Sequence, residues 1–171
     1  MLAACRELGI HEVSIYGFTK ENVCRPSDQV VSFRDACVSF ALRAIDGGAA
    51  LLAVGDSDSQ LFPAELLRFV RERSPGGGLR VNLLVNYGWQ WDLEGIHRCA
   101  ARTAAAFETS TLPRVELVVR WGGRRRLSGF LPLQCAYSDF CVIDALWPDA
   151  SRGDLIEALS WYQAQDVTMG G

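Results

Sequence analysis

Five short β-prone segments recur along this chain of 171 residues, and helical patterns separate most of them. The β-prone segments lie at residues 12–18, 49–54, 81–87, 115–119 and 138–143. The helical patterns lie at residues 2–8, 27–46, 63–73, 91–108 and 151–165. The first four strands alternate with helices as βαβαβαβ at intervals of roughly 30 residues, typical of right-handed crossovers in a parallel sheet covered by helices on both faces. The sequence therefore predicts a single α/β domain over residues 1–171 with a mostly parallel sheet.

Charge and apolar content exclude several classes of protein. The chain carries 17 Lys and Arg against 20 Asp and Glu, which excludes the strongly basic balance of a nucleic-acid-binding domain. Its 49% hydrophobic residues exclude disorder. No apolar run approaches the ~20 residues of a membrane-spanning helix, and no basic region leads into an apolar one at the N-terminus. We expect a cytoplasmic protein or one that associates with a membrane surface.

Neither the cysteines nor the histidines have the spacing of metal ligands. The six cysteines are scattered without a CxxC pair, at positions 5, 24, 37, 99, 135 and 141. We interpret them as reduced thiols used as small apolar residues, not as disulfides or zinc ligands. His11 and His97 have no partner at ligand spacing, so a histidine-centred site is not expected.

In parallel sheets ligands bind beyond the carboxyl ends of the strands, which selects the loops at residues 19–26, 86–92 and 120–128. The strongest signal is RWGGRRRLSGF at residues 120–130, where Arg120 ends a strand and three further arginines precede Ser128. A guanidinium group can donate two parallel hydrogen bonds to the oxygens of one phosphate. Free N–H groups of Gly122 and Gly123 would add uncharged donors. The alternative, a solvated arginine run, is less favoured because the run follows a buried strand in an acidic chain.

Two further loops carry weaker signals. The segment FTKENVCRP places Thr19, Glu21, Asn22 and Arg25 after a strand, although Glu21 could instead cap a helix or pair with Arg25. The segment NYGWQWD contains two tryptophans, at positions 89 and 91, which either line an apolar channel or pack in the core. Core packing is the better expectation for each.

The motifs in these loops resemble those of the cis-prenyltransferases, also called isoprenyl or undecaprenyl diphosphate synthases. VSIYGFTKENVCRP is similar to the family's YAFSxENWxRP, and VNLLVNYG to its LNxxxNYGG. RWGGRRRLSGFLPLQCAYSDF resembles RTxGExRLSNFLLWQxAYxEL, and ALWPD resembles DVLWPDF. These matches cover almost the whole chain, in order and with similar spacing.

The resemblance implies a parallel-sheet fold with a hydrophobic tunnel, and Mg²⁺-dependent condensation of isopentenyl diphosphate with an allylic prenyl diphosphate in Z geometry. It places Arg120, Arg126 and Ser128 on the diphosphate of isopentenyl diphosphate. It places Asp139 where the family has a glutamate that binds magnesium. Residues on the loop beside the allylic diphosphate and the proton-loss step would be Thr19, Asn22 and Arg25.

The chain also departs from the family pattern. Nothing in it matches the DGNxRWA-type loop whose aspartate binds the catalytic Mg²⁺, and the helical pattern at Met1 has no N-cap, so we expect the family's first strand and this loop to be missing. Trp89 and Gln90 replace the Gly-Arg of NYGGR, and Trp121 replaces a threonine. The residues before the terminal Gly-Gly lack the arginines of the family's RxRRFGG ending.

These departures leave three alternatives open. The chain is an isoprenyl transferase whose N-terminus lies upstream, a non-catalytic partner subunit of a cis-prenyltransferase, or an inactive remnant. Product length, primer, and linear, branched or cyclised products are not separable by sequence. The resemblance implies a homodimer or a heterodimer with another cis-prenyltransferase subunit, membrane association through a lipid product, and no nucleic-acid partner.

Overall fold

The computed structural model describes residues 1–98 and 107–165. The chain divides into two compact units, Leu2–Thr111 and Leu112–Gly171, the latter grouped with Met1. We call them the N-terminal unit and the C-terminal unit and describe each by itself. In the described ranges, no helix combines the length and apolar character needed to cross a bilayer.

The N-terminal unit contains a three-stranded parallel sheet in the order β1-β3-β2. The strands are β1 (Glu12–Thr19), β2 (Ala50–Val54) and β3 (Arg80–Tyr87). Every residue of β3 after Arg80 is buried, as expected of a central strand covered on both faces. All three predicted strands are thus confirmed, and their carboxyl ends meet at one edge of the sheet.

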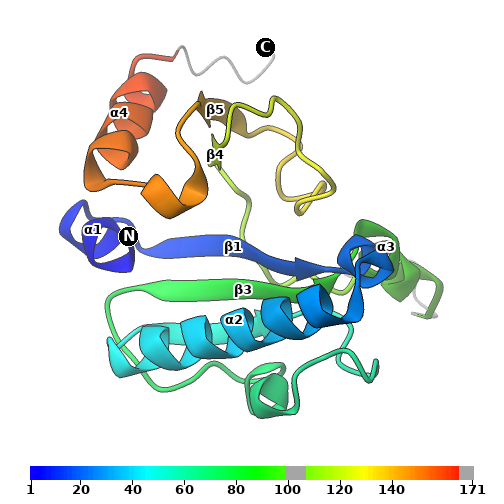
Figure 1. Ribbon diagram of the computed structural model, residues 1–171. Coiled ribbons are helices and arrows are strands. Elements are labelled where there is room, and N and C mark those ends of the chain that lie inside the picture. Colours follow the sequence, from blue (N-terminus) through cyan, green and yellow to red (C-terminus); the bar gives the residue numbers. More distant parts are fainter. Residues whose placement is uncertain (99–106, 166–171) are drawn as a thin grey trace. The chain divides into compact units, whose positions relative to one another are not determined.

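Three segments connect these strands: η1 (Lys20–Cys24) and α2 (Ser27–Asp46) between β1 and β2, and η2 (Ala64–Phe69) between β2 and β3. Helix α1 (Leu2–Glu7) precedes β1, and α3 (Trp89–Arg98) follows β3. The long helix α2 runs along the sheet in Figure 1 and contacts all three strands. It buries Val30, Cys37, Ala41 and Ala44, which lie on one helical face. The small side chains at its centre allow a close approach to the sheet.

Some helix boundaries differ from the predicted ones. The expected helix at 63–73 is only the 3₁₀ segment η2, which ends before the Pro-Gly-rich stretch that starts at Ser74. The residue at the N-cap position of α2 is Pro26, not Ser27. Helix α3 begins two residues earlier than predicted, and residues 99–106 of the predicted helix lie outside the described residues.

The C-terminal unit contains a parallel pair of strands, β4 (Leu117–Trp121) and β5 (Asp139–Ile143). They are followed by η4 (Trp147–Asp149) and α4 (Arg152–Gln163). A capping box opens α4: Asp154 N donates to Ser151 Oγ at 3.2 Å, and Ser151 N donates to Asp154 Oδ2 at 2.9 Å. The predicted start of the terminal helix at Ser151 is therefore confirmed. That residues 1–171 form one domain stays a prediction.

Candidate functional site

The loop after β1 brings two of the predicted residues into direct contact. Asn22 Oδ1 accepts hydrogen bonds from Thr19 N at 3.0 Å and from Thr19 Oγ1 at 3.1 Å. Because both bonds use the amide oxygen, the Nδ2 group of Asn22 is directed away from Thr19. The backbone N–H of Arg25 donates to the Asn22 carbonyl at 3.1 Å, so Asn22 organises the turn as a whole.

Arg25 is exposed at the end of this turn. Its guanidinium carbon lies 5.7 Å from the centre of the Phe33 ring on α2, a cation–π distance. Among the described residues it makes no ion pair with Glu21, so the alternative interpretation of Glu21 as its partner is not supported. The charge of Arg25 is therefore presented at the carboxyl edge of the sheet.

At the end of β3, backbone geometry and a buried network shape the second predicted loop. Asn86 is buried in a left-handed conformation (φ 51°), and its Nδ2 donates to the Asp56 carbonyl at 3.0 Å. The buried Asp92 carboxylate accepts from Tyr87 Oη at 2.9 Å, Thr109 Oγ1 at 2.7 Å and Thr109 N at 2.8 Å. The sequence analysis did not identify Asp92. Its position as an acidic residue in the first turn of the helix that follows β3 could have indicated it.

The two tryptophans of this loop differ in their surroundings. Trp91 is partly buried, with its ring 6.1 Å from that of Tyr87 in an edge-to-face arrangement. Trp89 is 41% exposed, so the expectation of core packing is wrong for this residue. Its position at the N-terminus of α3, just beyond the end of β3, accounts for the exposure.

In the C-terminal unit, Arg120 near the end of β4 contacts Ser128 in the loop that follows the strand. Arg120 Nη1 donates to Ser128 Oγ at 3.4 Å, a long hydrogen bond across an exposed loop. Ser128 has a left-handed φ of 53°, which turns the chain back toward the strand end. Arg126 is exposed on the same loop, with Arg124 and Arg125 before it. The loop therefore presents several exposed positive charges, and its binding of a diphosphate stays a prediction.

The glycines of this loop do not supply free donors. Gly122 N donates to the Ala145 carbonyl at 2.8 Å, and Gly123 N donates to the Ile143 carbonyl at 3.0 Å. Both glycines have positive φ values, 88° and 66°, which direct their N–H groups toward the end of β5. The prediction of free glycine N–H groups is wrong, because these groups tie the arginine loop to the neighbouring strand.

The structure separates Asp139 from Arg120 along the strand pair. Asp139 begins β5 opposite Leu117, whereas Arg120 lies opposite Val142. Three residues of strand correspond to about 10 Å, so Asp139 lies at the amino end of the pair and Arg120 toward the carboxyl end. A carboxylate closer to the arginine loop is that of Asp144, whose Oδ1 would lie 3.2 Å from a Cβ added to Gly123. Its position immediately after a predicted strand could have identified it.

Within the described ranges, no group of three or more His, Cys, Asp and Glu side chains could hold a metal ion. Mg²⁺ in phosphate-transfer sites often takes one or two carboxylates, with substrate phosphates and water as its other ligands. A single carboxylate such as Asp139 fits that mode, but it does not make a self-sufficient metal site. Asp139 could therefore be only one of several ligands of a substrate-bound magnesium ion, and its position about 10 Å along the strand pair from Arg120 does not place it beside the arginine loop.

The described cysteines are free thiols, as predicted. Burial raises the pKa of the Cys37 thiol to about 11, so it stays protonated at neutral pH. Cys24 differs from the expectation of apolar packing because it is exposed on η1, and Cys99 lies outside the described residues.

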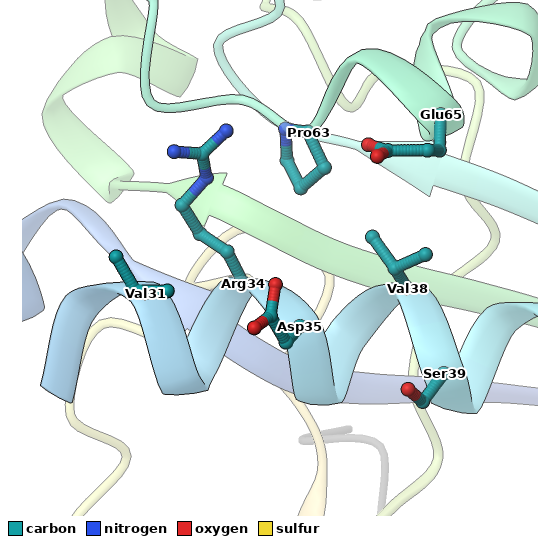
Figure 2. A pocket seen from close by; sticks show the side chains of 7 residues that line it. All are labelled: Val31, Arg34, Asp35, Val38, Ser39, Pro63 and Glu65. Carbon is teal, nitrogen blue, oxygen red and sulfur yellow. The ribbon is translucent and has the colours of Figure 1, made fainter. Parts of the chain in front are cut away.

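A cavity of about 310 Å³ opens between α2 and the start of η2. Figure 2 shows its lining residues: Val31, Arg34, Asp35, Val38, Ser39, Pro63 and Glu65. The Nε atom of Arg34 is buried there without a hydrogen-bond partner among the described residues. None of the predicted site residues lines this cavity.

Comparison with known proteins identifies the family. The family model described as "Putative undecaprenyl diphosphate synthase" matches residues 1–170. The chain belongs to this family. A relative named isoprenyl transferase from Clostridium perfringens is 30% identical, over 98% of this chain and 75% of its own length. A farnesyl-diphosphate-specific ditrans,polycis-undecaprenyl-diphosphate synthase from Aliivibrio fischeri is 26% identical, over 99% of this chain and 74% of its own length.

Solved structures confirm the predicted fold. A probable undecaprenyl diphosphate synthase from Campylobacter jejuni matches with a TM-score of 0.82 and 22% identity, over 99% of this chain and 88% of that one. A lavandulyl diphosphate synthase from Lavandula x intermedia, in complex with dimethylallyl diphosphate, matches with a TM-score of 0.84 and 20% identity, over 99% and 83%. The resemblance read from the motifs is therefore confirmed at the level of family and fold.

Proposed function

We propose that this protein is an isoprenyl transferase that condenses isopentenyl diphosphate with an allylic prenyl diphosphate to give a Z-configured product. The observation that carries the proposal is the family match over residues 1–170. The retention of arginine, hydroxyl and amide groups after two strands of the family fold supports it. The non-catalytic and remnant alternatives have no comparable support, since the relatives reported above carry the names of enzymes.

In this proposal the diphosphate of isopentenyl diphosphate binds to Arg120, Arg126 and Ser128. The Arg120–Ser128 contact at 3.4 Å supports a shared role, because both groups can donate to the oxygens of one phosphate. The bonds from Gly122 and Gly123 to the end of β5 would hold the loop in place. Charge and orientation would then come from side chains, with no contribution from the glycine N–H groups.

The allylic diphosphate would contact Thr19, Asn22 and Arg25. Arg25 would neutralise charge that develops on the leaving diphosphate, and its contact with Phe33 would orient the guanidinium. Asn22, whose amide oxygen is held by Thr19, would present Nδ2 to a phosphate oxygen or take part in the proton-loss step. Hydrogen bonds within the turn thus favour a role for these residues in positioning the substrate, and not a role as a general base.

The reaction balances as a substitution with loss of one proton. The allylic C–O bond breaks and releases diphosphate. The double bond of isopentenyl diphosphate then forms the new C–C bond, and the lengthened prenyl product loses one proton. Mg²⁺, when bound, would neutralise diphosphate charge, and Asp139 would be its ligand from this chain. The other residues bind, orient and shield the two diphosphates.

The test is incubation of the purified chain with radiolabelled isopentenyl diphosphate, Mg²⁺ and each of several allylic diphosphates of different length. We expect butanol-extractable radioactivity that EDTA abolishes and that Arg120→Ala reduces. A matched control is Arg152→Ala, an exposed arginine of the same unit outside the proposed site. Absence of incorporation with every primer, by this chain and by a version extended with any in-frame upstream sequence, would contradict the proposal.

Assembly and location are part of the same proposal. Sedimentation of the chain, alone and mixed with a family synthase, would test for the expected homodimer or heterodimer. Flotation with lipid vesicles, with and without product, would test membrane association through the product. A monomer both alone and in the mixture would contradict the expected dimer.

A further inference from the structure

An ion pair crosses the carboxyl edge of the N-terminal sheet. Lys20 Nζ lies 2.7 Å from Asp56 Oδ2, and the two side chains are 39% and 19% exposed. Lys20 follows the last residue of β1, and Asp56 lies two residues beyond β2. Because β3 separates β1 from β2, the pair spans two inter-strand spacings, about 10 Å.

The end of β3 leaves a path for the lysine side chain. A Cβ added to Gly88 would lie 3.1 Å from Cδ, 3.3 Å from Cβ and 3.4 Å from Cγ of Lys20. The aliphatic part of Lys20 therefore lies directly over Gly88. A larger residue at position 88 would have to displace the side chain that carries the charge.

Asp56 is the fixed partner of this pair. Its N–H donates to the Asn86 carbonyl at 3.3 Å, and its carbonyl accepts from Asn86 Nδ2 at 3.0 Å. The preceding Gly55 packs so closely that an added Cβ would lie 1.7 Å from the Val85 carbonyl oxygen. The end of β2 is thus bound to the end of β3. The ion pair in turn connects Lys20 to this fixed segment.

The segment on the other side of the pair has little else to hold it. None of the residues Lys20–Cys24 is buried, so hydrophobic packing contributes little to the position of η1. Its anchors include the Thr19–Asn22 bonds within the turn. The Lys20–Asp56 pair, in contrast, connects the turn to a different strand end.

We propose that Lys20 and Asp56 form a latch that positions the loop at residues 19–25 for the allylic diphosphate. Lys20 is then a positioning residue, and this role rests on the proposed function. The latch orients Asn22 and Arg25 without itself contacting substrate. Partly exposed ion pairs contribute little to stability, and salt weakens them further. We therefore expect loss of the Lys20–Asp56 pair to increase opening of the loop by about two- to fivefold.

The composition of the chain supplies a selective probe of this loop. Lys20 is the only lysine in the sequence, so lysyl endopeptidase can cut the chain only between Lys20 and Glu21. Cleavage requires the loop to open and the ammonium group to leave Asp56. Asp56→Asn should speed cleavage about two- to fivefold, and the difference from wild type should shrink in ~1 M salt. Asp58→Asn, which alters an exposed carboxylate two residues further on, should cleave at the wild-type rate.

Kinetics then test the role of the latch. Asp56→Asn and Lys20→Met should each lower kcat and raise the KM for the allylic diphosphate, with the KM for isopentenyl diphosphate unchanged. The double variant should be no worse than either single one, because both remove the same interaction. Circular dichroism of each variant verifies that it is folded.

Each outcome has a defined meaning. Equal cleavage of wild type and Asp56→Asn would overturn the latch whatever the activity, including the case in which Lys20→Met is slow because Lys20 binds substrate directly. Faster cleavage with unchanged kinetics would overturn the positioning role. Absence of condensation by the chain and by its upstream-extended version would contradict the proposed function, while the cleavage ratio would still decide whether the latch exists.

Discussion

The buried carboxylate of Asp92 is expected to be one of the strongest stabilising groups in the N-terminal unit. It accepts three hydrogen bonds, from Tyr87 Oη at 2.9 Å, Thr109 Oγ1 at 2.7 Å and Thr109 N at 2.8 Å. All three residues are at most 2% exposed. The carboxylate also lies in the first turn of α3, where the helix dipole favours negative charge. It therefore connects the end of β3, the start of α3 and the segment at Thr109.

The size of the effect follows from the bonds that a substitution removes. Asp92→Ala takes the acceptor from three buried donors, and at roughly 1–1.5 kcal/mol for each bond it should destabilise the protein by about 3–5 kcal/mol. That loss is a large part of the ~5–15 kcal/mol by which a domain is stable. Asp92→Asn keeps an acceptor for Thr109 N, and the hydroxyls can rotate to accept, so it should lose only about 1–2 kcal/mol.

Urea unfolding followed by circular dichroism measures these differences. The order of stability should be wild type, Asp92→Asn, Asp92→Ala, and Tyr87→Phe combined with Asp92→Ala should lose less than the sum of the single losses. Glu94→Ala, which removes an exposed carboxylate from the same helix, should stay within about 0.5 kcal/mol of wild type. A loss below 1 kcal/mol for Asp92→Ala would refute this account of the network.

Three further predictions concern other parts of the molecule. Arg120→Ala and Arg126→Ala should each raise the KM for isopentenyl diphosphate in steady-state assays, and a wild-type KM in both would contradict the proposed binding site. Gly17→Ala should lower the free energy of unfolding by about 1–3 kcal/mol, because the new Cβ would lie 2.8 Å from Cys37 Sγ, and adding Cys37→Ala should recover part of that loss. Hydrogen bonds from the Ser151 backbone and then from an indole N–H lower the pKa of Asp154 below its usual 3.8, so its stabilisation is present above that pH and is lost as the pH falls through the lowered value. Asp154→Asn should therefore reduce the acid-induced drop in melting temperature, and an unchanged acid profile would contradict this linkage.

The strands were predictable because their apolar pattern is local. The run at residues 81–87 is buried throughout, and such a run has few alternatives to a central parallel strand. The start of α4 was equally readable, since the Ser151–Asp154 spacing identifies a capping box on its own. In both cases the residues that determine the structure are neighbours in sequence.

The details of the candidate site depend on partners that are distant in sequence. The loop sequence around Gly122 and Gly123 predicts free N–H donors. In the structure these N–H groups donate to the carbonyls of Ala145 and Ile143, and no local sequence pattern indicates those partners. The register of β4 with β5 likewise decides that Asp139 lies about 10 Å along the strand from Arg120. Hydrogen-bond partners and register are set by the pairing of strands, and for that reason residue type and spacing did not reveal them.

The loop that carries Thr19 and Asn22 depends on such a distant pairing as well. The chain has Gly17 where the resembled motif YAFS has alanine, and a Cβ at this position would lie 2.8 Å from Cys37 Sγ and 3.0 Å from the Leu84 carbonyl oxygen. The strand register shifts between Tyr16 and Phe18, so Gly17 occupies the irregular step just before the loop. Because the Cys37 thiol stays neutral, with a pKa raised to about 11, it fills this space as a packing group. The missing methyl group at position 17 and the sulfur at position 37 therefore compensate for each other, and together they allow α2 to pack against β1 where the strand leads into the candidate site.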